Sequence, residues 1–190
     1  MAVHVPGIFA YIAAQVDTVL STRDVDPFHV YFDYGHYTEI GRNLSRKQAD
    51  QASQGKRYPL IWLVMDFEEL YDDTITDICT LPALQLFIVT ETEPALSTEE
   101  RMQKNFFPRL YPIYDELMNQ LGNSGLFTCG DPDSIKHRRI VRPYWGGQDA
   151  IGNSVTKLFP DFVDAIQIRE LNLEVDIPNC EQTILLTNNQ

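Results

Sequence analysis

The sequence predicts an α+β fold, a mostly antiparallel β-sheet with an N-terminal helix and a long kinked helix packed on it. Apolar residues recur at helical spacing over 5–21 and again over 97–121. Two further stretches, 58–67 and 81–92, are almost continuously apolar, and their length suits strands buried on both faces. At 190 residues the chain is expected to form one domain, residues 1–190, with a polar excursion at about 41–57.

The first third of the chain contains a helix, a strand and a polar stretch. Pro6 lies near the start of the amphipathic helix over 5–21. Residues 28–34 alternate between two faces, with Phe28, Val30, Phe32 and Tyr34 on one of them, which is typical of a half-buried strand. Residues 41–56 are rich in Gln, Ser, Lys and Arg. They are expected to form a long exposed loop or a surface helix.

The central third contains the two apolar strands and the second helix. The strands are separated by an acidic turn at 68–77 and are expected to pair antiparallel, because they are close in sequence. Ser97 and Glu100 match a capping box, so the helix is expected to begin there. Gly122 is expected to be its C′ residue. Pro108 and Pro112 should bend the helix or split it.

The last third is predicted to contain closing strands. These are expected at 126–129, 135–145, 164–177 and 183–187, with a loop at 146–156. Within 164–177 the apolar residues change from even to odd positions at Arg169–Glu170. A β-bulge there would return one face to the core.

Composition excludes several classes of protein. The formal net charge of −12 disfavours tight binding to nucleic acid. Cys79, Cys129 and Cys180 are scattered without CxxC spacing, which argues against a disulfide framework and a zinc site. Reduced thiols in a cytosolic compartment are expected instead. There is no apolar run long enough for a bilayer, and the N-terminus does not read as a signal peptide.

Motifs that carry chemistry are absent from the sequence. GxxxxGK[ST], GxGxxG, GxSxG and HExxH do not occur, so no enzyme activity, catalytic residue, cofactor or metal ligand is assigned. Cys129 beside His137 has no evident third orienting group. Two clusters have residue types that bind metals, but each reads more simply as a solvated polar surface. They are Asp24, Asp26, His29, Asp33 and His36, and Asp66, Glu68, Glu69, Asp72 and Asp73.

Charged residues indicate a candidate interface between copies. A dense basic run, residues 136–142, reads either as the charged outer face of a strand or as a strip that docks on the acidic patch of a neighbouring copy. Opposite charges on separate faces suit head-to-tail contacts, which close into rings. The polar stretch is a candidate for reaching a neighbour. The candidate interface residues are Lys136, Arg138, Arg139, Arg142, Asp66, Glu68, Glu69, Arg46 and Lys47.

The order of these elements resembles a known class of ring-forming proteins. The stretches that carry the resemblance are YPLIWLVMDF, LPALQLFIVTETEP, STEERMQKNFFPRLYPIYDELMNQL and IQIRELNLEVDI. They look like the tail-terminator and tail-completion proteins, and the related neck (head–tail connector) ring proteins, of tailed bacteriophages. The resemblance covers most of the chain after residue 28. Residues 41–56 and 122–157 exceed a minimal subunit of that type.

The resemblance implies a structural function. It implies a homo-oligomeric ring in the tail or neck of the virion, assembled in the host cytoplasm and acting in virion assembly. Adjacent tail-tube and neck or portal-side proteins would be its partners, DNA would pass without specific binding, and no membrane would be involved. Two alternatives stay open: a metal-dependent enzyme that uses an Asp/His cluster, and a non-viral protein-binding adaptor module.

Overall fold

The computed structural model describes residues 3–71, 78–128, 132–145 and 161–177. Its helices are α1 (Val5–Thr22), α2 (Tyr37–Ala49), α3 (Thr98–Arg101) and α4 (Tyr111–Asn123), with a π-helical segment, η2 (Met102–Leu110), between the last two. Short 3₁₀ turns are η1 (Gln54–Lys56) and η3 (Pro132–Ser134). The strands are β1 (Tyr31–Gly35), β2 (Leu60–Val64), β3 (Leu70–Tyr71), β4 (Ile78–Glu91), β5 (Arg138–Trp145) and β6 (Val163–Asp176). This is the predicted α+β class.

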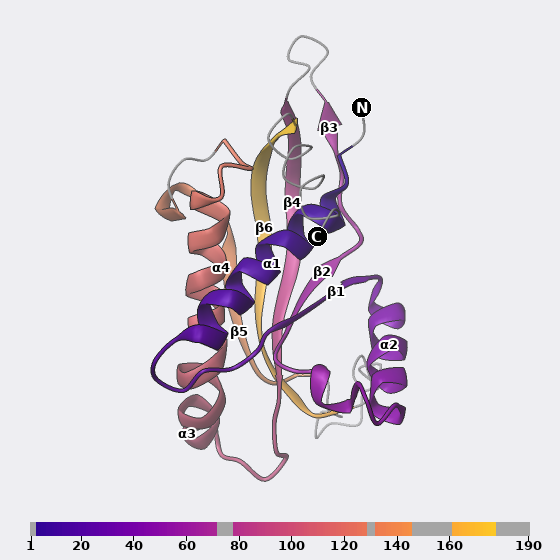
Figure 1. Cartoon of the computed structure of the whole chain (residues 1–190), viewed down its shortest axis with the longest axis vertical. Coiled ribbons are helices and arrows are strands. Elements are labelled where there is room, and N and C mark those ends of the chain that lie inside the picture. Colours follow the sequence, from indigo (N-terminus) through magenta and orange to yellow (C-terminus); the bar gives the residue numbers. More distant parts are fainter. Residues whose placement is uncertain (1–2, 72–77, 129–131, 146–160, 178–190) are drawn as a thin grey trace.

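The described strands form one six-stranded sheet in the order β1-β2-β4-β6-β5, with β3 paired to β4 (Figure 1). β2 and β4 pair antiparallel, with Trp62 opposite Phe87, which confirms the predicted pairing of the two apolar stretches. β1 pairs with β2 in parallel, so the sheet is mixed although mostly antiparallel. β1 and β5 are therefore the outer strands of that order, and β3 is a short additional strand that pairs with β4 alone.

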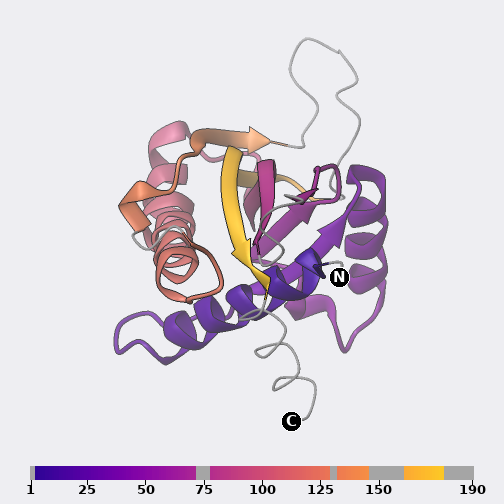
Figure 2. The same cartoon turned by 90° about the horizontal axis from the view of Figure 1, so that it is seen from above.

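The sheet is covered differently on its two faces. α1, η2 and α4 pack on one face and form the larger core with alternate residues of β4 and β6. Ile40 and Leu44 of α2 pack on the other face, against the β1–β2 end. Figure 2 shows α4 and α2 on opposite sides of the sheet. β2 lies under both layers, and each of its five residues is buried, as its apolar run predicts.

Two bulges in the β4–β6 ladder return apolar residues to the larger core. β6 has one extra residue between Ile168 and Leu171, which confirms the predicted bulge, and Glu170 there has φ +54°. β4 has its own extra residue near Ala83, with φ +55°. The Ala83 N–H donates to Asn172 Oδ1 at 3.1 Å, so the two bulges are joined by one side chain.

The long helix begins as predicted and ends later than predicted. Ser97 and Glu100 form the capping box, with the Ser97 N–H donating to Glu100 Oε2 at 2.8 Å. The helix continues through Pro108, which lies within the π-helical segment Met102–Leu110, and it returns to α form at Tyr111. The prediction that Gly122 is the C′ residue is wrong, since α4 continues to Asn123.

Several other segments differ from the sequence predictions. Residues 37–49 form a helix, the second of the two alternatives expected for 41–56, but it begins earlier than expected and buries Ile40 and Leu44 on one side. The predicted strand at 126–129 contributes only an isolated bridge between Phe127 and Val175. β3 lies inside the predicted acidic turn. The predicted loop 146–156 and strand 183–187, with Cys129, Cys180, Asp72 and Asp73, lie outside the described residues.

Candidate interaction surface

The basic run of β5 is divided between the two faces of the sheet. In the antiparallel β5–β6 ladder Arg138 lies opposite Arg169 and Arg139 lies opposite Ile168. Paired residues project to the same face, and successive residues alternate. Arg138 and Arg142 therefore share the face with Arg169, whereas Arg139 lies on the face covered by α4. The sequence run that looked continuous is two separate sets of cations.

The basic side chains on the face covered by α4 contact residues of the same chain. The guanidinium of Arg139 lies over the rings of Tyr111 and Tyr114, 5.5 and 4.8 Å from their centroids. His137 Nε2 lies 2.6 Å from the Tyr114 hydroxyl, and its Nδ1 lies 2.8 Å from the Ile135 carbonyl. These contacts hold β5 against α4. Arg139 is therefore less available to a partner than the sequence alone indicated.

The opposite face carries what we call the arginine face: Arg138, Arg142 and Arg169, with Gln85, Gln167 and the Tyr37 hydroxyl. Arg142 Nε donates to Gln167 Oε1 at 2.6 Å, and Gln85 Nε2 donates to the Tyr37 oxygen at 2.9 Å. Arg138 pairs with Glu170 at 3.0 Å. Arg169 is exposed.

Several charged side chains influence the pKa of the Tyr37 hydroxyl. Burial raises the pKa of Tyr37, while the hydrogen bond from Gln85 and the charges of Arg169 and Arg142 lower it. The carboxylate of Asp66 also acts on this hydroxyl and raises its pKa. The charge of Asp66 therefore acts on the same hydroxyl as the charges of Arg142 and Arg169.

An aromatic row lies beside these polar groups. The Trp62 and Phe87 rings stack at 4.9 Å, and Phe87 stacks on Trp145 at 4.4 Å. Tyr37 meets Trp62 edge to face, also at 4.9 Å. Trp62 Nε1 donates to the Gly35 carbonyl at 3.0 Å, which fixes the buried indole. The row gives the arginine face a rigid apolar margin.

The other candidate interface residues lie at the β1–β2 side of the molecule. Asp66, Glu68 and Glu69 are exposed between β2 and β3, and Glu69 accepts a hydrogen bond from the Tyr71 hydroxyl at 2.7 Å. Arg46 and Lys47 are in the last turn of α2, where cations are favourable to the helix dipole. Lys47 Nζ pairs with Asp33 Oδ2 at 3.4 Å and ties α2 to β1.

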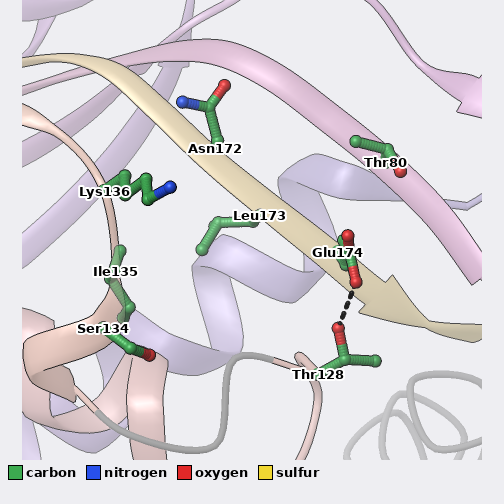
Figure 3. A pocket seen from close by; sticks show the side chains of 8 residues that line it. All are labelled: Thr80, Thr128, Ser134, Ile135, Lys136, Asn172, Leu173 and Glu174. Atoms are coloured by element: carbon green, nitrogen blue, oxygen red, sulfur yellow. Dashed lines mark hydrogen bonds between the residues drawn. The ribbon is translucent and has the colours of Figure 1, made fainter.

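Lys136 lies apart from the arginine face, in a shallow pocket of about 250 Å³ beside β6 (Figure 3). Lys136 and Asn172 lie at one end of it, and Thr128 donates to Glu174 at 2.7 Å at the other. The Lys136 carbonyl accepts from the Asn172 N–H at 3.3 Å. Hydrogen bonds therefore join lining residues at both ends of the pocket.

The first metal-ligand cluster considered from the sequence is dispersed. Its members bind different neighbours: Asp26 pairs with Arg109, His29 with Asp17, Asp33 with Lys47, and His36 with Thr38. Across the described residues, no group of three or more His, Cys, Asp or Glu side chains is arranged to hold a metal. Cys79 is buried, and burial raises the pKa of its thiol.

Four members of the arginine face, Arg169, Tyr37, Gln85 and Gln167, were not identified from the sequence as site residues. Arg169 was noted only because the apolar phase changes beside it, and that phase change was the available signal. Tyr37 and Gln85 lie in segments with no motif. They meet because α2 packs over β2 and β4, a contact between residues 48 positions apart.

Comparison with known protein families and curated proteins does not identify a family for the chain. No protein-family model matches the chain, and no curated protein matches it significantly. Within the ranges that the structure describes, no helix is both long and apolar enough to cross a membrane.

Proposed function

We propose that the chain is a structural subunit of a ring in the tail or neck of a tailed bacteriophage, acting in virion assembly and DNA passage. The observation that supports this proposal most directly is that the outer strands β1 and β5 lie at opposite ends of one sheet. The two edges have different sequences and different neighbours. Unlike edges favour a head-to-tail contact, and a head-to-tail contact that closes produces a ring.

The two edges also differ in charge. The β5 side carries Arg138 and Arg142 on the face opposite α4, next to Arg169 of β6. The β1–β2 side carries the exposed carboxylates of Glu68 and Glu69, together with Arg46 and with Lys47, whose charge is paired with Asp33. A contact between the β5 side of one copy and the β1–β2 side of the next would bring opposite charges together. Complementary charges fix the register of such a contact.

The outer strand β5 has features that disfavour pairing with a strand of another chain. It carries exposed arginines and Pro143, which has no backbone N–H. Its register shifts between Arg142 and Trp145, where Tyr144 has φ +55°. Charges, proline and bulges are the features that keep outer strands from aggregating. The proposed contact therefore uses side chains rather than a continued sheet.

The net charge suits DNA passage through such a ring. At −12 per chain, a ring of identical copies would present a strongly acidic surface. Like charge keeps DNA phosphates from adhering to the wall of the channel.

The test is the oligomeric state of the purified chain, by native mass spectrometry and negative-stain electron microscopy. We expect closed rings of one copy number at high protein concentration. Glu68→Lys should weaken assembly, whereas Asp24→Lys, an equal charge change at an exposed residue after α1, should not. A chain that stays monomeric and is absent from purified particles would overturn the proposal.

Deleting residues 43–54 could not test whether the polar stretch contacts a neighbouring copy. It would remove Leu44, which is fully buried against the sheet, together with half of α2. The resulting loss of assembly would reflect misfolding.

A further inference from the structure

We infer that the arginine face is a docking surface for a carboxylate-rich peptide segment of an adjoining protein subunit, with Arg142 and Arg169 as the groups that bind the carboxylates. This inference rests on the proposed assembly function and specifies the chemistry of one contact in it. The sequence indicated a basic docking strip over residues 136–142, but not that Arg142 acts together with Arg169 of the neighbouring strand.

The arrangement of the arginines is unfavourable without a partner. Arg138 and Arg169 lie directly opposite each other on neighbouring strands, where like charges are destabilising. Glu170 pairs with Arg138 at 3.0 Å. Arg169 makes no ion pair with any described residue. The chain has 27 acidic and 15 basic residues, so cations grouped on one sheet face need a reason other than solubility.

The donors are already oriented. The bond from Arg142 Nε to Gln167 Oε1 fixes the plane of that guanidinium. Gln167 is itself only 4% exposed, which makes it a rigid support. Within the described parts of the chain, no hydrogen bond engages the terminal nitrogens of Arg142. A planar guanidinium fork binds a carboxylate through two parallel hydrogen bonds, which matches this geometry.

The margins of the surface suit a peptide. Trp145 and Tyr37, whose rings both pack on Phe87, are partly exposed aromatic side chains that can contact the apolar atoms of a bound segment. The Gln85 amide and the Tyr37 hydroxyl add neutral hydrogen-bonding groups. A segment with carboxylates at its contact points and apolar atoms between them fits all three kinds of group.

Charge distribution favours a short acidic peptide over nucleic acid. Duplex DNA carries one phosphate per about 1.7 Å, so it would extend past three arginines onto acidic surface such as Asp66. A peptide with a few carboxylates ends within the arginine face. At physiological salt, charges more than about 8 Å away are largely screened, so the local arginines dominate its binding.

The test uses the full chain and three probes: a hexaglutamate peptide, a peptide of residues 64–71 (VMDFEELY), and a single-stranded oligothymidine. NMR titration would follow the arginine Nε–Hε signals. We expect the two peptides to shift Arg142 and Arg169. Arg142→Gln/Arg169→Gln should weaken peptide binding about tenfold or more, because charge-assisted hydrogen bonds are lost.

The control is Lys56→Gln/Lys104→Gln, which removes the same charge from exposed residues of η1 and η2. It should change peptide binding less than about twofold, with thermal melts confirming that both variants fold. Equal weakening by both variants, tighter binding of the oligothymidine, or no shift at either arginine would each overturn the inference.

The assembly state separates this inference from the proposed function. If the wild-type chain forms rings but the arginine variant assembles equally well and no peptide binds, only the inference fails. If the peptides bind through the arginines while the chain stays monomeric and absent from particles, the proposed ring function fails and the docking surface stands.

Discussion

Replacing Arg101 with methionine should destabilise the protein by about 3 kcal/mol. The guanidinium is 4% exposed and its ion-pair partner, Asp164, is fully buried. Every Arg101 nitrogen donates: Nε to the Leu96 carbonyl, Nη1 to Thr92 Oγ1 and Asp164 Oδ1, and Nη2 to the Glu93 and Pro94 carbonyls. These bonds join the start of the long helix to the ends of β4 and β6.

The expected loss of stability depends on the lost attraction to Arg101 and on the hydrogen bonds that Asp164 would retain. At the observed separation of 3.1 Å, an effective dielectric constant of about 20 gives an attraction of about 5 kcal/mol. Asp164 would still accept hydrogen bonds from Asn105 Nδ2 at 2.6 Å and the Tyr144 N–H at 2.7 Å. Those two donors offset part of the loss. Methionine preserves most of the volume, so a cavity adds little.

Urea unfolding of Arg101→Met, Asp164→Asn and the double variant would measure this directly. Because each single change strands a buried partner, the double variant should lose clearly less than the two single losses added together. Arg138→Gln is the control, since its pair with Glu170 is 63% and 58% exposed and should contribute at most about 1 kcal/mol. A loss below about 1 kcal/mol for Arg101→Met, or strict additivity, would refute the reasoning.

Two further changes test local features of the helices. Gly122→Ala should destabilise the fold by about 1–3 kcal/mol in thermal melts, because a Cβ would lie 2.5 Å from the Pro132 nitrogen, whereas Gly55→Ala meets nothing within 4 Å and should be neutral or slightly stabilising. Hydrogen bonds from the Ser97 backbone and hydroxyl lower the pKa of Glu100 below its ordinary 4.5. Its contribution to stability is therefore present above pH 4.5 and is lost as the pH falls through the lower folded-state pKa. Glu100→Gln should remove that part of the acid destabilisation, and an unchanged pH profile of unfolding would contradict this assignment.

Features with short sequence range were predicted correctly. The capping box at Ser97 and Glu100 depends on groups three residues apart, so local spacing is sufficient to identify it. The bulge at Arg169–Glu170 was readable because strand side chains alternate strictly, and an inserted residue changes their phase. The antiparallel pairing of the two apolar strands followed from their proximity in the chain.

Features that depend on packing between distant segments were missed. The parallel pairing of β1 with β2 requires a crossover through α2, and α2 has only Ile40 and Leu44 to bury. Two apolar residues in a polar stretch give a weak helical signal. They stabilise the helix only by packing against the sheet, which the local sequence does not show. Gly122 was assigned to the helix end because glycine is common there, but close approach of Pro132 is what requires it.

The arginine face also combines features set by the local sequence with features set by the packing of distant segments. The sequence by itself determined which residues carry charge, and its apolar pattern indicated the strands β2, β4, β5 and β6, because both charge and apolar character belong to the local sequence. Only the tertiary structure decided that Arg139 turns to the tyrosines of α4 while Arg142 and Arg169 share the other face. Strand register sets this, and register is fixed by the burial of apolar side chains along the whole ladder, not by the charged residues themselves.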